Sequence, residues 1–226
     1  MSRSLTKSEL DSIIGIAISK INELLYEYLH LCEDDKYRKR AALIAYWIID
    51  YVKYIREEDN FVPENLIKYS RGDLLIVNFG YRIGRELGGR HFAIVLDMDN
   101  SKYSPNITVI PLTSLKNTTK KNKFVHILKD DIPKLYQRKS DEIIGVTNTI
   151  SNAKRKINSM SNYEKDIINL KEGSVAQIGQ ITTISKQRIV SPKNTNDALY
   201  GLKISTDDLD AINEKVKNLY VFMNKT

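Results

Sequence analysis

The chain has 226 residues, of which 42% are hydrophobic and 28% are charged, a balance that is ordinary for a folded globular protein and argues against disorder. Its single cysteine, Cys32, excludes an internal disulfide framework and any multi-cysteine metal site. The sequence shows neither a signal-peptide pattern nor eighteen successive apolar residues, so we expect a cytoplasmic protein that does not enter a membrane.

The strongest periodicity lies in the first 58 residues. Thr6 followed by Glu9 predicts a capping box at the start of a helix. The apolar residues that follow are spaced alternately four and three apart, on one helical stripe: Leu10, Ile14, Ala17, Ile21, Leu24, Tyr28 and Leu31. After the charged stretch EDDKYRKR, the same spacing resumes at Ala41, Ala45, Ile48, Val52 and Ile55. We therefore expect residues 6–58 to form a helical hairpin, for which a packing or dimerisation role is favoured over a catalytic one.

A linker at Asn60–Lys68, which contains Pro63, divides the chain into expected domains at 1–62 and 63–226. Beyond it, the short apolar runs LLIVNF, FAIVLDM and ITVIPL predict strands of a compact, bent sheet. The loop between the first two of these strands holds four glycines: Gly80, Gly84, Gly88 and Gly89. A glycine loop of this kind lets the backbone approach a ligand closely.

The rest of the chain is less regular. KFVHIL predicts another strand, in which His126 alternates with apolar neighbours and is assigned a structural role. A polar stretch at 130–172 is expected to hold short helices around 153–160 and 163–170. SVAQIGQITTI predicts one or two closing strands, and Ser205 or Thr206 is expected to cap a final amphipathic helix.

The formal net charge of +7 is unevenly distributed. From Lys116 to Lys156 eleven Lys and Arg residues stand against four Asp and Glu residues, so the surplus of 11 − 4 = 7 equals that of the whole chain. A basic segment suits a polyanion, because each phosphate contact releases condensed counterions. A solvated surface that promotes solubility is an equally good interpretation of the charge alone.

Several common enzyme classes are excluded because the sequence has no Walker loop, dinucleotide fingerprint, zinc motif or nucleophile elbow. What remains is Arg90-His91 after the glycine loop, Thr113-Ser114 at the end of a strand, and a basic turn after it. These residue types suit cleavage of a phosphodiester by a neighbouring 2′-hydroxyl, which needs proton transfer and a cation but no metal or other cofactor. Taken singly, all four residues are also compatible with structural roles.

The order of these motifs resembles the MazF/PemK family. The matching pieces are Arg71-Gly72-Asp73, the loop Gly84–Gly89, the strand FAIVLDMDN and the turn Pro111–Ser114. A later segment, Gln180–Arg188, is similar to the closing strand of the family and the turn after it. The likeness covers about residues 69–117 and 173–226, so that 130–172 reads as an insertion and the helical hairpin lies outside it.

The resemblance implies an α+β fold, with a small SH3-like β-barrel and a C-terminal helix, here preceded by the N-terminal helical hairpin. It implies a type II toxin, a metal-independent endoribonuclease that cuts single-stranded mRNA by 2′-hydroxyl transesterification. In that reading Arg90 stabilises the phosphate and His91 acts as acid or base. Thr113 and Ser114 then position the phosphate or the nucleophile. The residues expected to contact RNA are Arg85, Glu86, Lys116, Lys120, Lys121, Lys123 and Gln180.

Two positions depart from the family pattern. Where relatives have an Arg-Pro pair the chain has His91-Phe92, and the arginine is displaced to Arg90. Because adjacent strand residues face opposite ways, this displacement could turn the guanidinium away from the phosphate. Gly179 stands where many relatives have an acidic residue. The alternative function is therefore a nucleic-acid-binding or partner-binding module with the same fold and no turnover.

The resemblance also implies partners. They are single-stranded RNA, a cognate antitoxin, a second copy of the chain in a homodimer, and operator DNA bound through the antitoxin complex. The hairpin is not explained by the family, and we expect it either to recruit the antitoxin or to lock the dimer.

Overall fold

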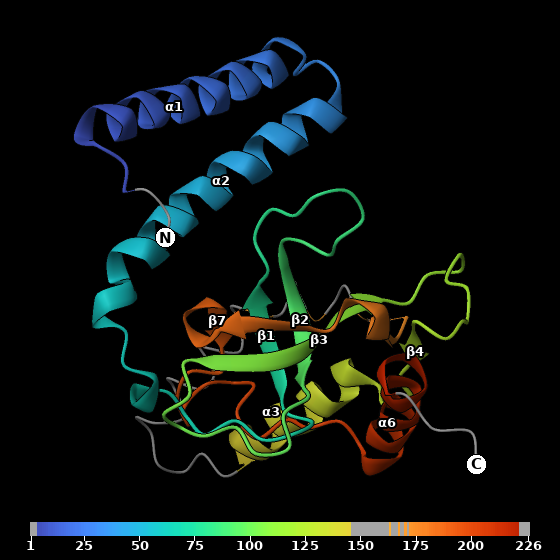
Figure 1. Cartoon of the computed structure of the whole chain (residues 1–226). Coiled ribbons are helices and arrows are strands. Elements are labelled where there is room, and N and C mark those ends of the chain that lie inside the picture. Colours follow the sequence, from blue (N-terminus) through green and yellow to red (C-terminus); the bar gives the residue numbers. More distant parts are fainter. Residues whose placement is uncertain (1–3, 146–162, 164–166, 168–169, 171, 222–226) are drawn as a thin grey trace. The chain divides into compact units, whose positions relative to one another are not determined.

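The computed structural model describes residues 4–145, 163, 167, 170 and 172–221. The chain divides into two compact units, Met1–Glu58 and Asp59–Thr226, which we describe separately (Figure 1).

The first unit is the expected helical hairpin, with α1 at Lys7–His30 and α2 at Asp35–Glu57. The predicted capping box starts α1. The Thr6 hydroxyl accepts a hydrogen bond from the Glu9 amide at 3.2 Å, and the Glu9 carboxylate accepts one from the Thr6 amide at 2.8 Å. Two of the free N–H groups at the helix start are satisfied in this way.

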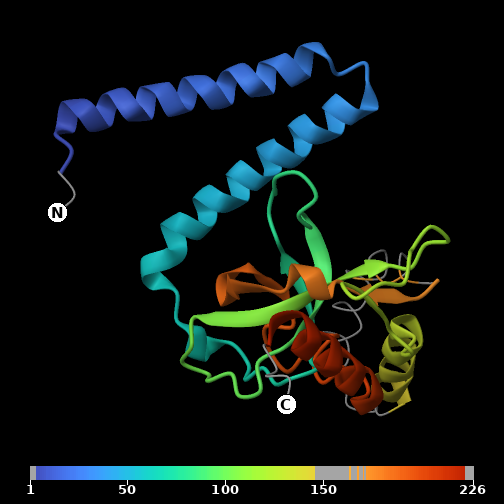
Figure 2. The ribbon, with the colours of Figure 1, turned by 45° about the vertical axis from the view of Figure 1, so that its right-hand side comes forward.

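The two helices contact each other mainly near their turn. There the rings of Tyr28 and Tyr37 lie 5.5 Å apart, and Figure 2 shows α1 and α2 diverging from this point. As a result neither helix contains a buried residue. Among the described residues, no helix has the length and apolar character needed to span a bilayer.

The second unit is built on an antiparallel sheet. Its strands are β1 Leu74–Asn78, β2 Arg90–Val95, β3 Asn106–Ser114, β4 His126–Ile127, β5 Ser174–Ala176, β6 Thr182–Ser185 and β7 Ile189–Ser191. They follow the order β4-β5-β3-β2-β1-β7, and β6 pairs with β3 outside this path. β3 is the shared strand, because its first half pairs with β6 and its last three residues pair with β5.

The helices of this unit are α3 Ile132–Gly145 and α6 Thr206–Tyr220. Short 3-10 helices lie at η1 Glu58–Asn60, η2 Pro63–Asn65, η3 Ile178–Gln180 and η4 Lys186–Arg188. Ser205 caps α6 as predicted, since its side chain accepts a hydrogen bond from the Asp208 amide at 3.3 Å.

The α+β class and the C-terminal helix are confirmed, but the expected SH3-like barrel is not closed among the described residues. The sheet order ends at β4 on one side and β7 on the other, and these two strands do not pair with each other. Both are short, with two and three residues, and each pairs with one neighbour only. Edges this short cannot supply the ladder that closure requires.

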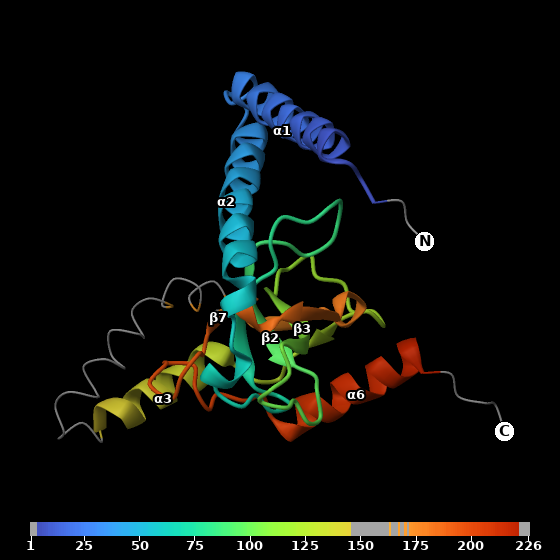
Figure 3. The same cartoon turned by 60° about the vertical axis from the view of Figure 1, so that its left-hand side comes forward.

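Alternation along the strands produces two apolar cores, one on each face of the sheet. Leu74, Ile76, Phe92 and Ile94 face one core, which is completed by residues of α3 and α6. Figure 3 shows these two helices along the same side of the sheet. Leu75, Val77, Ala93 and Val95 face the second core together with Tyr69 and Phe79.

The three central strands follow their predictions, and the C-terminal half departs from them. Only His126 and Ile127 of KFVHIL form a strand, because the Phe124 amide turns back to donate to the Asn122 side chain at 2.8 Å. The prediction did not include α3. The predicted helix around 153–160 lies outside the described residues, and of 163–170 only Tyr163, Ile167 and Leu170 are described.

Arg71, the first residue of the RGD-type motif, has a structural role. Its guanidinium donates to the Leu96 carbonyl and to the Asn213 side chain. It therefore joins the segment before β1 to the end of β2 and to α6. Burial lowers the pKa of Arg71, and the nearby Asp97 carboxylate opposes that shift.

Candidate functional site

The β1–β2 loop, residues 79–89, is closed by backbone hydrogen bonds at its base. The Phe79 amide donates to the Gly89 carbonyl at 2.8 Å, and the Gly89 amide donates to the Gly80 carbonyl at 2.7 Å. Gly89 has a φ of 84°, and a Cβ on Gly88 would lie 2.7 Å from the Gly80 carbonyl oxygen. The glycines are thus required by the turn itself, because a side chain at either position strains or blocks it.

The Gln180 side chain holds the other end of this loop. Its Oε1 accepts from the Leu87 amide at 2.6 Å, and its Nε2 donates to the Arg85 carbonyl at 3.1 Å. Gln180 lies in η3, 93 residues further along the chain than Leu87. The residue predicted to contact RNA therefore contacts the backbone of the loop and fixes its position.

A pocket of about 450 Å³ lies between this loop and the segment from η3 to β6. Its lining residues are Phe79, Arg82, Arg85, Glu86, Leu87, Pro111, Gly179, Gln180, Ile181 and Thr182. Arg82 donates through Nε to the Phe79 carbonyl at 3.1 Å and approaches the Glu86 carboxylate at 3.8 Å. The pocket thus combines two cations and one carboxylate above an apolar floor.

Arg90 and His91 lie on opposite faces of the sheet. His91 pairs in register with Val77, and Phe79 lies on the same face as Val77. Ala93 lies on the same face of β2 as His91 and pairs with Pro111. Phe79 and Pro111 line the pocket, so His91 lies on the pocket face.

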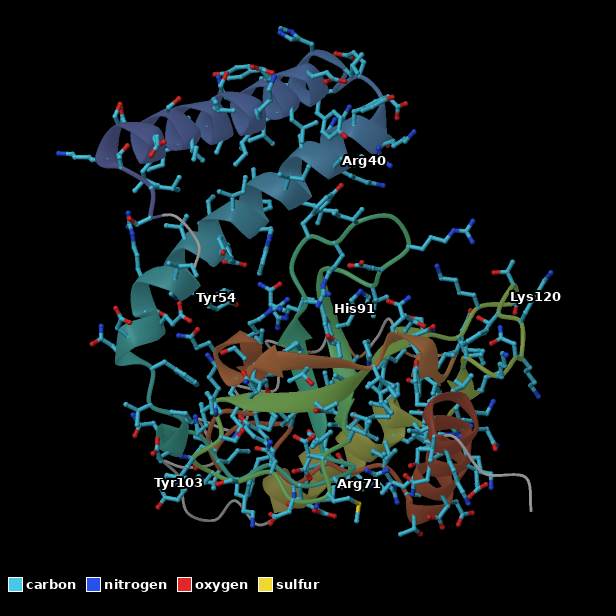
Figure 4. All side chains as sticks on the ribbon, in the orientation of Figure 1. Arg40, Tyr54, Arg71, His91, Tyr103 and Lys120 are labelled. Carbon is cyan, nitrogen blue, oxygen red and sulfur yellow. The ribbon has the colours of Figure 1, made fainter. Side chains whose placement is uncertain are left out.

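The neighbouring Arg90 points the other way, and its guanidinium carbon lies 5.6 Å from the ring centre of Tyr163, a residue of the opposite core. Figure 4 shows His91 near the end of β2 that leads into the loop.

Thr113 lies two residues beyond Pro111 on β3 and so shares the pocket face, whereas Ser114 faces away from it. The Thr113 hydroxyl accepts a hydrogen bond from Gln177 Nε2 at 2.8 Å. Ser114 pairs in register with Ser174 of β5. The structure therefore brings His91 and Thr113 to one face and one end of the sheet, and places Arg90 and Ser114 on the other face.

Residues 70–168 match the family model described as PemK-like, MazF-like toxin of type II toxin-antitoxin system. This part of the chain is similar to a MazF/PemK-like toxin domain. The matched range continues through 130–168, which the motif comparison assigned to an insertion, and ends before the Gln180–Arg188 segment. No curated protein matches the chain.

A solved structure of an endoribonuclease in complex with its cognate antitoxin, from a mycobacterial species, is similar to the chain with a TM-score of 0.38 and 10% sequence identity. The likeness covers 66% of this chain and 92% of that one.

The basic turn, Lys116–Lys123, is joined to the rim of the pocket by Phe124, the residue that follows it. Lys116, Lys120, Lys121 and Lys123 are all exposed, and Figure 4 shows Lys120 on a loop well apart from His91. Lys123 Nζ lies 5.2 Å from the Phe124 ring centre. The Phe124 carbonyl accepts from the amide of Gly179, a residue that lines the pocket, at 3.0 Å.

This contact explains the glycine at position 179. A Cβ there would lie 3.2 Å from Phe124 Cβ and 3.3 Å from its ring. The aromatic side chain therefore fills the space that a side chain at residue 179 would need. Residue 179, where the sequence was expected to depart from the family pattern, thus packs against the aromatic residue that follows the basic turn.

His126 has the structural role that the sequence indicated. Its Nε2 lies 2.8 Å from Asp208 Oδ1, and the fully buried Asp208 carboxylate also accepts from the amides of Lys129 and Asp130 at 3.0 and 3.1 Å. This network joins β4 and the start of α3 to α6, away from the pocket.

Three residues of the site were not predicted from the sequence: Arg82, Gln177 and Arg188. Arg188 donates through Nε to the Asn78 carbonyl at 2.8 Å, at the point where β1 enters the loop. The sequence offers a signal for Arg82, because this residue lies in the glycine loop, which was expected to approach a ligand. The other two act through residues more than 60 positions away.

Proposed function

We propose that the MazF/PemK-like domain is the toxin of a type II toxin–antitoxin pair and that it cuts single-stranded RNA with the neighbouring 2′-hydroxyl as nucleophile. The observation that supports this best is the shared face of His91 and the pocket, whose walls also carry Arg85 and Glu86. An imidazole on the face of the sheet that carries the pocket, and a carboxylate and a guanidinium that line the pocket, are groups that phosphodiester cleavage uses.

Each proton moved in the proposed reaction has a donor and an acceptor. Glu86 accepts the proton of the 2′-hydroxyl, the 2′-oxygen attacks phosphorus, and the protonated His91 imidazole donates to the departing 5′-oxygen. The products are a 2′,3′-cyclic phosphate and a 5′-hydroxyl, and neither proton transfer needs a metal ion. Arg85, exposed at the pocket, stabilises the charge on the phosphate oxygens.

Arg90 is the alternative candidate for the cation that stabilises the charge on the phosphate. Its position beside Tyr163 is on the other face of the sheet, so it would have to leave the ring to reach a phosphate in the pocket. Thr113, bound to Gln177, positions the sugar or phosphate rather than reacting, and Ser114 supports it from the other side of the strand. The exposed lysines of the basic turn guide the RNA backbone past Phe124.

Incubation of the purified protein with a defined single-stranded RNA and excess chelator tests this proposal. Wild type should yield 5′-hydroxyl fragments, and His91→Ala and Arg85→Ala should each slow cleavage by about a hundredfold, the usual size of an acid–base or electrostatic contribution. Arg90→Ala should retain most activity. Lys102→Ala, an exposed lysine in the β2–β3 connection, is the matched control. Undiminished cleavage by His91→Ala, or no cleavage by wild type, would contradict the proposal.

The proposal extends to partners. A cognate antitoxin should occupy the groove of the pocket, and operator DNA should bind through the toxin–antitoxin complex. An antitoxin encoded beside this gene should abolish RNA cleavage when it is added in equimolar amount. Cleavage that continues at saturating antitoxin would show that the antitoxin binds elsewhere.

A binding module without turnover is the second candidate, and the position of Arg90 favours it. If Arg90 is the only residue able to stabilise the phosphate, its place on the far face leaves the pocket without catalysis. This candidate predicts salt-sensitive association with RNA or DNA and no cleavage products in the same assay.

A further inference from the structure

The helical hairpin exposes apolar side chains over more than half of the circumference of α1. Beyond the stripe predicted from its spacing, Ile13, Ile16 and Ile18 are 48%, 59% and 63% exposed. At 100° per residue Ile16 lies beyond one edge of that stripe, Ile18 beyond the other, and Ile13 at the edge near Ile16, so the apolar arc spans about 200°. An apolar arc this wide exceeds the stripe that one partner helix covers, so α2 alone can bury only part of it.

The exposed apolar area of the hairpin is large enough for a stable interface. Fifteen large apolar side chains of α1 and α2 are exposed: Leu10, Ile13, Ile14, Ile16, Ile18, Ile21, Leu24, Tyr26, Leu29, Leu43, Tyr46, Ile49, Tyr51, Val52 and Ile55. At roughly 90 Å² each they leave on the order of 1,300 Å², whereas a standard interface buries about 800 Å² per partner. Monomeric proteins rarely expose patches of more than a few hundred Å².

The charges of the two helices are opposite in sign. α1 carries two lysines against four acidic residues, a net charge of −2. α2 carries six Lys and Arg residues against three acidic residues, a net charge of +3. Each hairpin therefore carries one acidic and one basic helix. When two copies pair about a two-fold axis, the acidic α1 of each copy can face the basic α2 of the other.

We infer that the hairpin is a self-association element, in which the hairpins of two chains form a four-helix assembly with α1 of each copy against α2 of the other. The apolar spacing of four and three in both helices is the pattern that such assemblies bury. This inference concerns residues 4–58 and does not depend on RNA cleavage by the other unit.

The mass of the full-length protein in solution, measured by sedimentation over a hundredfold concentration range, tests the inference. Wild type should show twice the mass, or an even multiple, of an Ile13→Glu/Ile16→Glu variant at the same concentration. Helix content measured by circular dichroism should fall on dilution together with the mass, because neither helix has a core of its own.

Two control variants separate lost apolar packing from added charge. Ser8→Glu/Ser12→Glu adds the same charge at exposed polar positions of α1 and should keep the wild-type mass. Ile13→Leu/Ile16→Leu keeps the apolar surface and should also keep it.

A wild type that has the mass of one chain at every concentration would overturn the inference, as would an unchanged mass in the Glu variant. Binding of single chains to phospholipid vesicles without self-association would assign the apolar surface to a lipid interface and would overturn it as well.

Discussion

Replacing Gln180 with methionine tests how the loop of residues 79–89 is held beside the pocket. The substitution keeps the length and volume of the side chain but removes its amide. The Leu87 amide then loses an acceptor at 2.6 Å, and the Arg85 carbonyl loses a donor at 3.1 Å. Both backbone groups belong to the loop, so the perturbation acts on its position and leaves the sheet intact.

The size of the effect follows from the two lost hydrogen bonds. Each contributes about 1 kcal/mol net, so the closed form of the loop should lose about 2 kcal/mol relative to the open form. Since about 1.4 kcal/mol corresponds to a factor of ten, the open population should rise about thirtyfold. RNA cleavage should fall with it, because Arg85 and Glu86 leave the pocket when the loop opens.

Native-state hydrogen exchange at the Leu87 amide measures this directly. Exchange should accelerate about thirtyfold in Gln180→Met, while the Val95 amide, which donates to the Asp73 carbonyl within the sheet unit, should be unaffected. Gln187→Met makes the same chemical change seven residues away and should leave Leu87 at its wild-type rate. An exchange rate within threefold of wild type in Gln180→Met would refute the reasoning, and equal acceleration at Val95 would indicate global destabilisation instead.

Three further predictions concern stability. Gly179→Ala should lower the free energy of unfolding by about 1 kcal/mol, because its Cβ would lie 3.2 Å from Phe124. Denaturant unfolding should show that Gly179→Ala costs less when Phe124→Ala is also present. Asp208→Asn should lower the free energy of unfolding by about 3 kcal/mol, since it leaves buried amides poorly paired. Asp207→Asn, at an exposed position, should change it little. Equal losses of stability in thermal melts of the two variants would contradict this. Burial lowers the pKa of Lys186, so between that lowered pKa and the ordinary lysine value near 10.4 the unfolded chain binds more protons than the folded one. In this pH range the free energy of unfolding should therefore rise with pH. Lys186→Met should make the free energy of unfolding less dependent on pH, as measured by denaturant unfolding at several pH values.

Features encoded by neighbouring residues could be predicted from the sequence. The capping box of Thr6 and Glu9 and the Ser205 cap depend on groups within three positions of each other. Strand alternation also indicated that Arg90 and His91 would face opposite ways, which the register of β1 and β2 bears out. Local chemistry fixes these features before any tertiary contact forms.

Features that depend on distant pairing could not be predicted. Gln180 reaches a loop 93 residues away, and Gln177 binds Thr113 across 64 positions. Nothing in the local sequence distinguishes these glutamines from solvent-exposed ones. That the described strands leave the expected barrel unclosed could not be predicted for a related reason. The lengths of β4 and β7 are set by where their neighbours end, and apolar runs such as KFVHIL do not reveal that.

The contact between Phe124 and Gly179 couples two positions that are 55 residues apart in the sequence. A side chain at 179 and an aromatic ring at 124 compete for the same space, so a larger residue at 179 fits best when residue 124 is small. In an alignment of relatives the two columns should therefore change together. On this expectation, the glycine at residue 179 is one half of a paired change whose other half is the aromatic residue at 124, directly after the basic turn.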